Sequence, residues 1–207
     1  MTSAPACTVH IIDDEEALRD SLAFLFASRG IATRLWPSGE AFLAAWPQTD
    51  CGCIILDVRM EGISGPQLID ALFDTEGSAA ALPPVIFLTG HADVPLAVQS
   101  LKRGAFDFLE KPFNDNQIVD LALQATALHH TRAAELTNRA ELAARFATLS
   151  DREVEVMRLI VEGKLNKQIA DQLGIAMRTV EVHRARVLQK TGARNSAELA
   201  RMQAALT

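Results

Sequence analysis

Tyrosine is absent from the 207-residue chain, and aromatic residues of all kinds make up only 5% of it. Cysteine is scarce as well, with Cys7, Cys51 and Cys53 as the whole set. An odd and sparse set of cysteines excludes a disulfide scaffold and is typical of a reducing compartment. Because no histidine stands at ligand spacing from the C-x-C pair, we expect these thiols to be structural rather than zinc ligands.

The sequence also lacks a long uncharged apolar run. A membrane helix needs roughly 20 consecutive apolar residues, and the mean hydropathy of the chain is only +0.11. The N-terminal segment has no basic region before its first apolar run, unlike a secretory signal peptide. We therefore expect a cytoplasmic protein with no membrane partner.

Charge is unevenly divided along the chain. The whole chain holds 26 acidic and 20 basic residues and has a formal net charge of −6. Residues 1–122 contain 17 of the acidic and 7 of the basic residues, whereas residues 123–207 have a net charge of +4. An acidic half followed by a basic half predicts two domains with different partners, and the basic one is a candidate for binding nucleic acid.

The acidic half alternates between short apolar runs and amphipathic segments. We expect five strands, at residues 8–12, 31–36, 53–56, 85–88 and 105–109. A helix is expected between each strand and the next, and the last of these helices covers residues 93–103. The runs are continuously apolar, which is typical of parallel strands buried on both faces. We predict an α/β fold with a doubly wound, five-stranded parallel sheet.

Polar residues follow four of these strands: Asp13 and Asp14, then Asp57, Thr89 and Lys111. Ligands of doubly wound sheets bind outside the carboxyl ends of the strands, so we expect all five residues in one site. Carboxylates suit Mg²⁺, and an aspartate can accept a phosphoryl group as a nucleophile. A lysine and a threonine hydroxyl can both contact phosphate oxygens.

The basic half is predicted to be helical throughout. A long helix is expected from Asn114 to about Ala147, either continuous or broken near residues 129–130. This helix either forms part of a dimer interface or packs on its own domain. Ser150 and Glu153 have the spacing of a capping box for the next helix. Short helices over residues 166–173 and 178–191, joined through a glycine, predict a helix-turn-helix within a small four-helix domain.

The second of these helices is the expected recognition helix. Its period directs Val180, Val187 and Leu188 to the core with His183 near them. The residues expected to face DNA bases in the major groove are Glu181, Val182, Ala185 and Arg184. Those expected to contact DNA phosphates are Lys167, Arg178, Thr179 and Arg186.

Two sets of motifs resemble known families. Residues 8 to about 125 closely resemble the receiver domain of two-component response regulators through IIDDEEALRDSL, ILDVRM, FLTGHADVPLAV and GAFDFLEKPF. The segment from LSDRE through EGKLNKQIA to RTVEVHRARVLQK resembles the LuxR-type helix-turn-helix. Together they resemble the FixJ-type branch, which implies a flavodoxin-like receiver (1–125), a linker helix (126–147) and a DNA-binding domain (148–207).

The resemblance implies a role for each pocket residue. Asp57 would be the phosphoacceptor for a sensor histidine kinase. Mg²⁺ would be bound by Asp14, Asp57 and the main-chain carbonyl of Arg59, with Asp13 assisting through water. The residues that contact phosphate or act as switches would be Thr89, Lys111 and Phe108, and the Lys111–Pro112 bond would be cis.

The chain departs from the family pattern at two positions. Glu61 stands where FixJ-type chains usually have proline, which adds negative charge beside the pocket, frees the backbone and is expected to alter kinase docking or the lifetime of the phosphate. With no tyrosine available, the switch residue is Phe108, which can signal only by packing. Both departures lie close to the expected phosphorylation site.

The implied function is a transcriptional regulator rather than an enzyme. Phosphorylation would favour a homodimer that binds double-stranded DNA and recruits RNA polymerase. Three alternatives remain: a phosphotransfer protein with a degenerate DNA domain, a pseudo-receiver that needs no phosphate, and an aspartate-dependent phosphatase. The phosphatase is disfavoured because Arg59 stands where haloacid-dehalogenase-type enzymes require a second aspartate.

Overall fold

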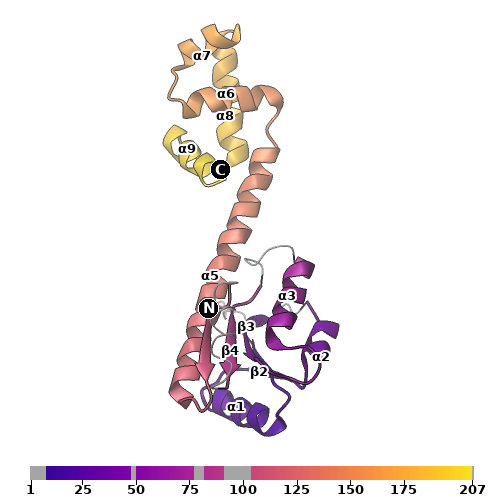
Figure 1. Ribbon diagram of the computed structural model, residues 1–207. Coiled ribbons are helices and arrows are strands. Elements are labelled where there is room, and N and C mark those ends of the chain that lie inside the picture. The colour runs from indigo at the N-terminus through magenta and orange to yellow at the C-terminus, as the bar shows by residue number, and fades with distance from the viewer. Residues whose placement is uncertain (1–7, 48–49, 77–81, 91–103, 207) are drawn as a thin grey trace. The chain divides into compact units, whose positions relative to one another are not determined.

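The computed structural model describes residues 8–47, 50–76, 82–90 and 104–206 (Figure 1). The chain divides into two compact units, Met1–Ala133 and Ala134–Thr207. The boundary falls inside one long helix, α5 (Asp115–Ala147). Each unit has its own buried apolar core. The helix expected over residues 93–103 lies outside the described residues, as does Cys7.

The N-terminal unit is built on a parallel sheet with the strand order β2-β1-β3-β4-β5. Every residue of the three central strands is buried, as their continuous apolar runs predict. The doubly wound five-stranded sheet is therefore confirmed. Its strands are β1 (Thr8–Ile12), β2 (Thr33–Trp36), β3 (Cys51–Asp57), β4 (Val85–Thr89) and β5 (Asp107–Glu110).

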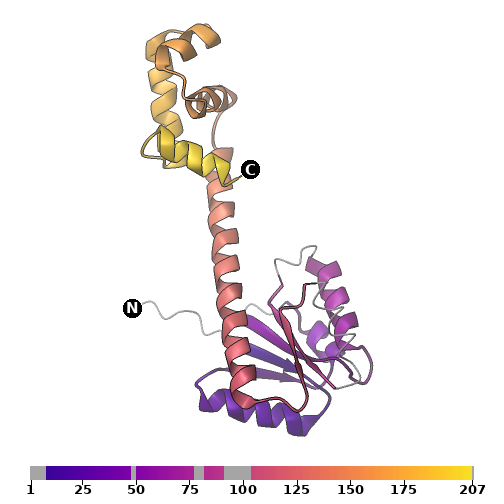
Figure 2. The same ribbon diagram turned by 60° about the vertical axis from the view of Figure 1, so that its left-hand side comes forward.

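Helices cover both faces of this sheet (Figure 2). One buried cluster joins Phe26 of α1 (Glu16–Ser28) and Ile118 of α5 to Ile55 of β3. The other joins Phe42 of α2 (Gly39–Ala44) and Leu72 of α3 (Gly65–Glu76) to Leu56. Because successive side chains of a strand point to opposite faces, neighbouring residues of β3 anchor both helix layers.

An aromatic cluster fills the space between β1, β2 and α2. His10 is fully buried, and its Nδ1 accepts a hydrogen bond of 3.1 Å from Nε1 of Trp36. The rings of Phe42 and Trp46 continue the cluster. Burial lowers the pKa of His10 to about 4, so this histidine is a neutral core residue at physiological pH.

Helix α5 is continuous through His129 and His130, which settles the question of a break. Its buried residues lie in the first three turns, Ile118 to Ala125, and every residue from 131 to 141 is exposed. The expected Lys111–Pro112 cis bond is present before the helix begins. Among the described helices none is long and apolar enough to cross a membrane.

The C-terminal unit is all-helical, as predicted. Its helices are α6 (Asp151–Val161), α7 (Asn166–Leu173), α8 (Met177–Thr191) and α9 (Ser196–Ala204). Gly174 and Gly192 end α7 and α8 with φ of +64° and +77°, a conformation that favours glycine. The core takes four residues from α6 and one or two from each of the other helices, including Val156, Ile169, Val180, Val187 and Leu199.

The predicted capping box at the start of α6 is present. Ser150 Oγ accepts from the Glu153 amide at 3.4 Å, and Glu153 Oε2 accepts from the Ser150 amide at 2.9 Å. Lys190 Nζ of α8 lies 2.6 Å from the same Glu153 oxygen. The hydrogen bond from Lys190 and the one from the Ser150 amide lower the pKa of Glu153 to about 2. The cap therefore ties the start of α6 to the end of α8.

The Glu153→Gln variant should destabilise the C-terminal unit in a pH-dependent way. A carboxyl group with a lowered pKa in the folded state stabilises fully above its unfolded value of 4.5, and this stabilisation is lost as pH falls towards about 2. We therefore expect the variant to have a lower free energy of unfolding than wild type above pH 4.5, and the difference between the two to decrease steadily below that pH. Urea unfolding followed by the methyl resonances of Val156 and Leu159 measures this. A gap that does not change with pH would contradict the role of the charge.

Candidate functional site

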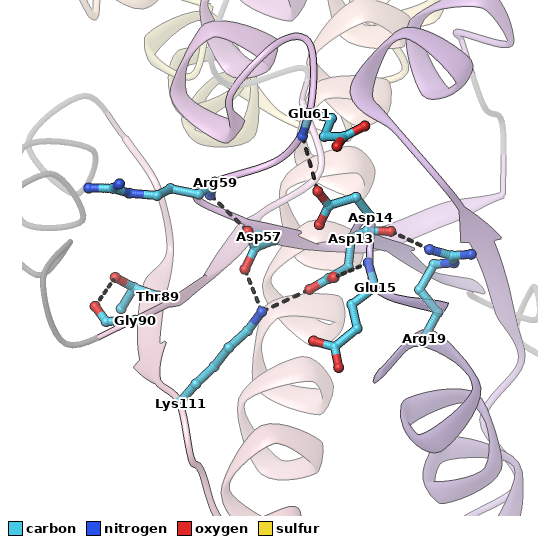
Figure 3. A network of polar contacts seen from close by, with 10 residues as sticks. All are labelled: Asp13, Asp14, Glu15, Arg19, Asp57, Arg59, Glu61, Thr89, Gly90 and Lys111. Atoms are coloured by element: carbon cyan, nitrogen blue, oxygen red, sulfur yellow. Dashed lines mark hydrogen bonds and ion pairs between the residues drawn. The ribbon is translucent and has the colours of Figure 1, made fainter. Parts of the chain in front are cut away.

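The carboxyl edge of the sheet brings together residues from three strands (Figure 3). Asp13 follows β1, Asp57 ends β3, and Lys111 follows β5. Lys111 Nζ lies 2.5 Å from Asp57 Oδ1 and 3.0 Å from Asp13 Oδ2. One ammonium group is thus shared by two carboxylates that are 44 positions apart in the sequence.

Burial sets the electrostatics of this site. Asp57 is 6% exposed and Asp13 is 1% exposed. Burial raises the pKa of Asp57, although the hydrogen bond and charge of Lys111 work against that rise. Burial lowers the pKa of Lys111, but its hydrogen bonds to Asp57 and Asp13 outweigh this effect, and its pKa is raised overall. Lys111 therefore stays protonated beside the carboxylates.

The orientation of the Asp57 carboxylate is fixed at both oxygens. Oδ1 accepts from Lys111, and Oδ2 accepts from the Arg59 amide at 2.8 Å. Behind it, Gly65 packs so closely that a Cβ there would lie 2.5 Å from the Asp57 carbonyl oxygen and 2.9 Å from the Phe87 ring. Only glycine fits at this point. The sequence showed Gly65 merely as a loop residue, because the close contacts are made with β3 and β4, which are separate elements in the sequence.

The loop after β3 is held by carboxylates at alternate residues. The Arg59 amide donates to Asp57, and the Glu61 amide donates to Asp14 at 3.1 Å. The Ile63 amide donates to Glu40 Oε1 at 2.8 Å. A proline at position 61 has no amide hydrogen and could not make the second bond. The departure from the family pattern at Glu61 therefore has a direct structural consequence. Glu40 was not foreseen as part of the site.

The two expected switch residues lie beside the pocket. Thr89 is fully buried, and its hydroxyl donates to the Gly90 carbonyl at 3.0 Å rather than to Asp57 (Figure 3). The Thr89 carbonyl accepts from the Lys111 amide at 2.8 Å, which links the ends of β4 and β5. Phe108 is half-buried against the same cluster as Phe87. Among the described residues, neither side chain forms a hydrogen bond to the Asp13 or Asp57 carboxylate.

The donor set at this edge suits a hard cation. Within the described ranges, no group of three or more His, Cys, Asp or Glu side chains forms a metal site by itself. Asp14 and Asp57 have carboxylate oxygens at this edge, where they accept from backbone amides of the loop after β3, and the Arg59 carbonyl is expected from the sequence to add a neutral oxygen. Mg²⁺ is usually bound through one or two carboxylates and keeps several waters, so this set fits Mg²⁺ and no all-side-chain cage is needed.

The predicted DNA-facing ridge of α8 is on the surface. Glu181, Val182 and Ala185 are exposed, and Val182 is exposed by 45% despite being apolar. Val180 and Val187, predicted for the core, are fully buried on the opposite side of the helix. All four residues expected to contact phosphates are also exposed: Lys167, Arg178, Thr179 and Arg186.

Arg184 does not share that ridge. It is half-buried, and its guanidinium donates to Asn166 Oδ1 at 3.2 Å and to Ser196 Oγ at 2.5 Å. These acceptors are the first residues of α7 and α9. The structure therefore gives no support to the expectation that Arg184 faces the bases, because its donor groups are directed into its own domain.

Comparison with known proteins assigns each half of the chain to a family. Residues 9–123 match the response regulator receiver domain family, and residues 147–203 match the bacterial regulatory proteins of the luxR family. The chain is 71% identical to the C4-dicarboxylate transport transcriptional regulatory protein DctR of Rhodobacter capsulatus, over 94% of this chain and 98% of that protein. It is 47% identical to the transcriptional regulatory protein FixJ of Azorhizobium caulinodans, over 94% and 90%.

Solved structures give the same result. The response regulator StyR superposes with a TM-score of 0.87 at 34% identity, over 96% of this chain and 98% of that one. Full-length FixJ from B. japonicum superposes with a TM-score of 0.61 at 39% identity, over 98% of both chains. The chain therefore belongs to the two-component response regulators, transcriptional regulators rather than enzymes, and within them to the FixJ type.

Proposed function

We propose that a sensor histidine kinase phosphorylates this chain on Asp57, and that phosphorylation controls dimerisation and sequence-specific DNA binding. The geometry of Asp57 carries the proposal: a nearly buried carboxylate oriented at both oxygens, with a charged lysine 2.5 Å away. In the transfer, a carboxylate oxygen bonds to phosphorus while the bond from phosphorus to the donor's histidine nitrogen breaks. The product is an aspartyl phosphate.

The residues around Asp57 have separate tasks in this step. Asp14, Asp57 and the Arg59 carbonyl would hold Mg²⁺, and Asp13 would assist through water. When bound, the ion offsets the repulsion between the carboxylate and the incoming phosphoryl group. Lys111, already charged and aimed at Asp57, would neutralise the phosphoryl oxygens.

The response to phosphorylation would begin at Thr89. Its hydroxyl would leave the Gly90 carbonyl and donate to the phosphate, and Phe108 would repack inward into the space this creates. Without a hydroxyl, Phe108 can report the change only through packing. The effect is a population shift, so the unphosphorylated chain should retain weak dimerisation and DNA binding.

The output would be a homodimer on two DNA half-sites that recruits RNA polymerase. The exposed ridge of α8 would read bases through Glu181, Val182 and Ala185. The phosphate contacts would position the helix without carrying sequence information, and come from Lys167, Arg178, Thr179 and Arg186. The Lys167→Ala, Arg178→Ala double variant separates this proposal from a phosphotransfer protein, because only a DNA-binding regulator loses its output.

Acetyl phosphate with Mg²⁺ should add one phosphoryl group to the wild-type chain, as measured by intact mass. The adduct should be absent from the Asp57→Asn variant and from wild type in EDTA. The variant keeps the size of the side chain but removes the nucleophilic carboxylate, so it is a matched control. An unmodified wild type, or an equal adduct on the variant, would exclude Asp57 as an acceptor for this donor.

The Glu61→Pro variant should bind Mg²⁺ more tightly. The Glu61 amide now occupies Asp14 Oδ2, and proline removes that donor. A hydrogen bond to a charged group contributes about 1.5 kcal/mol at the low end of its range, which corresponds to a gain of roughly tenfold in Mg²⁺ affinity. The control is Glu61→Ala, which keeps the amide but removes the negative side chain and should not tighten binding. Calorimetric Mg²⁺ titration tests this, and equal affinities of the two variants would contradict the competition.

We further propose that the chain regulates C4-dicarboxylate transport. The supporting observation is the 71% identity to a regulator named for that process, across nearly the whole of both chains. Replacing the chromosomal gene with the Asp57→Asn form should abolish induction of C4-dicarboxylate uptake in the native host, and a wild-type copy should restore it. Uptake of labelled succinate that is still fully induced in the variant strain would refute this assignment.

A further inference from the structure

Arg184 differs from most basic residues of the C-terminal unit, whose side chains are exposed. Its guanidinium reaches from the middle of α8 to the first residue of α7 and the first residue of α9. Both acceptors, Asn166 Oδ1 and Ser196 Oγ, are neutral. These two contacts connect the recognition helix to two other helices through one side chain.

The side of α8 on which Arg184 lies follows from the helix period. Arg184 comes four residues after Val180 and three before Val187, and both valines are fully buried. Residues at such spacings share one face of a helix. Val182 lies on the opposite face, whereas Glu181, three residues before Arg184, borders both faces. The two hydrogen bonds of Arg184 direct its guanidinium towards α7 and α9 rather than towards the exposed side of Val182.

The apolar core already joins α7, α8 and α9 through Ile169, Val187 and Leu199. Arg184 adds a polar connection at the edge of this core, beside an open hollow of about 590 Å³ whose lining includes Lys164, Asn166 and Ser196. The planar fork of an arginine can donate in two directions at once, which a lysine on one nitrogen does less well.

We propose that Arg184 is a positioning residue for DNA recognition. By joining α8 to Asn166 and Ser196, it sets how the recognition helix is presented, so that base contacts and phosphate contacts form in the same register. This inference rests on the proposed DNA-binding function. Loss of the bridge should weaken binding to the specific sequence at every base position together and leave the number of phosphate contacts unchanged.

The test uses the full-length chain treated with acetyl phosphate and Mg²⁺. The probe is a duplex that the wild-type chain selects from a random-sequence pool, compared with a scrambled duplex of the same composition. Fluorescence anisotropy over a range of salt gives the affinity and the slope of log K against log salt. The variant is Arg184→Met, and the matched control is Arg186→Met, which removes an exposed guanidinium two residues away on the same helix.

For Arg184→Met we expect about a tenfold loss of affinity for the selected duplex, a smaller loss for the scrambled one, and an unchanged salt slope. For Arg186→Met we expect similar losses on both duplexes and a shallower slope, since a phosphate contact is removed. A shallower slope for Arg184→Met would overturn the proposal in favour of a phosphate contact. A loss confined to one position in a series of single-base-substituted duplexes would overturn it in favour of base reading.

The Asn166→Ala, Ser196→Ala variant keeps the proposal testable if Arg184→Met fails to fold, because it removes both acceptors and leaves the guanidinium in place. It should reproduce the loss of specific affinity. Where Arg184→Met folds, adding it to this variant should cost little more, because both changes break the same bridge. Full specific affinity without the acceptors would refute the proposal. A wild-type chain that selects no duplex would instead refute the proposed DNA-binding function itself.

Discussion

The shared ammonium of Lys111 is the interaction on which the acidic pocket depends. Asp13 and Asp57 come from neighbouring strands and are almost wholly buried, and two buried carboxylates without a counterion would be strongly destabilising. Lys111 arrives from the far side of β4 and neutralises both. The sheet order therefore does more than bury apolar strands, since it brings a cation from the edge of the sheet to its acidic centre.

Much of the fold could be predicted because its signals are local. The continuous apolar run of β3, the Ser150 cap and the glycines that end α7 and α8 all act on residues within a few positions. The gathering of Asp13, Asp57 and Lys111 could also be predicted, because parallel strands present their carboxyl ends at one edge. The continuity of α5 could not, since its exposed middle gives no packing signal in either direction.

Details of the sites depended on contacts between distant segments. Gly65 needs to be glycine only because the Asp57 carbonyl passes 2.5 Å from where its Cβ would lie. Glu40 holds the Ile63 amide across a gap of 23 residues, which no spacing rule indicates. Arg184 is different, because the sequence alone shows that the helix period places it on the same side of α8 as Val180 and Val187. The expectation that it faces the bases followed from its positive charge and not from this spacing.

The indole cluster around His10 gives the chain an unusual optical property. Both of its tryptophans lie in the N-terminal unit, at Trp36 and Trp46, and there is no tyrosine anywhere. Tryptophan fluorescence therefore reports on the receiver alone, and the helix-turn-helix unit has no tryptophan signal. The second unit contributes to far-ultraviolet circular dichroism through its helices. Comparing tryptophan fluorescence with circular dichroism during unfolding therefore distinguishes the transitions of the two units without any label.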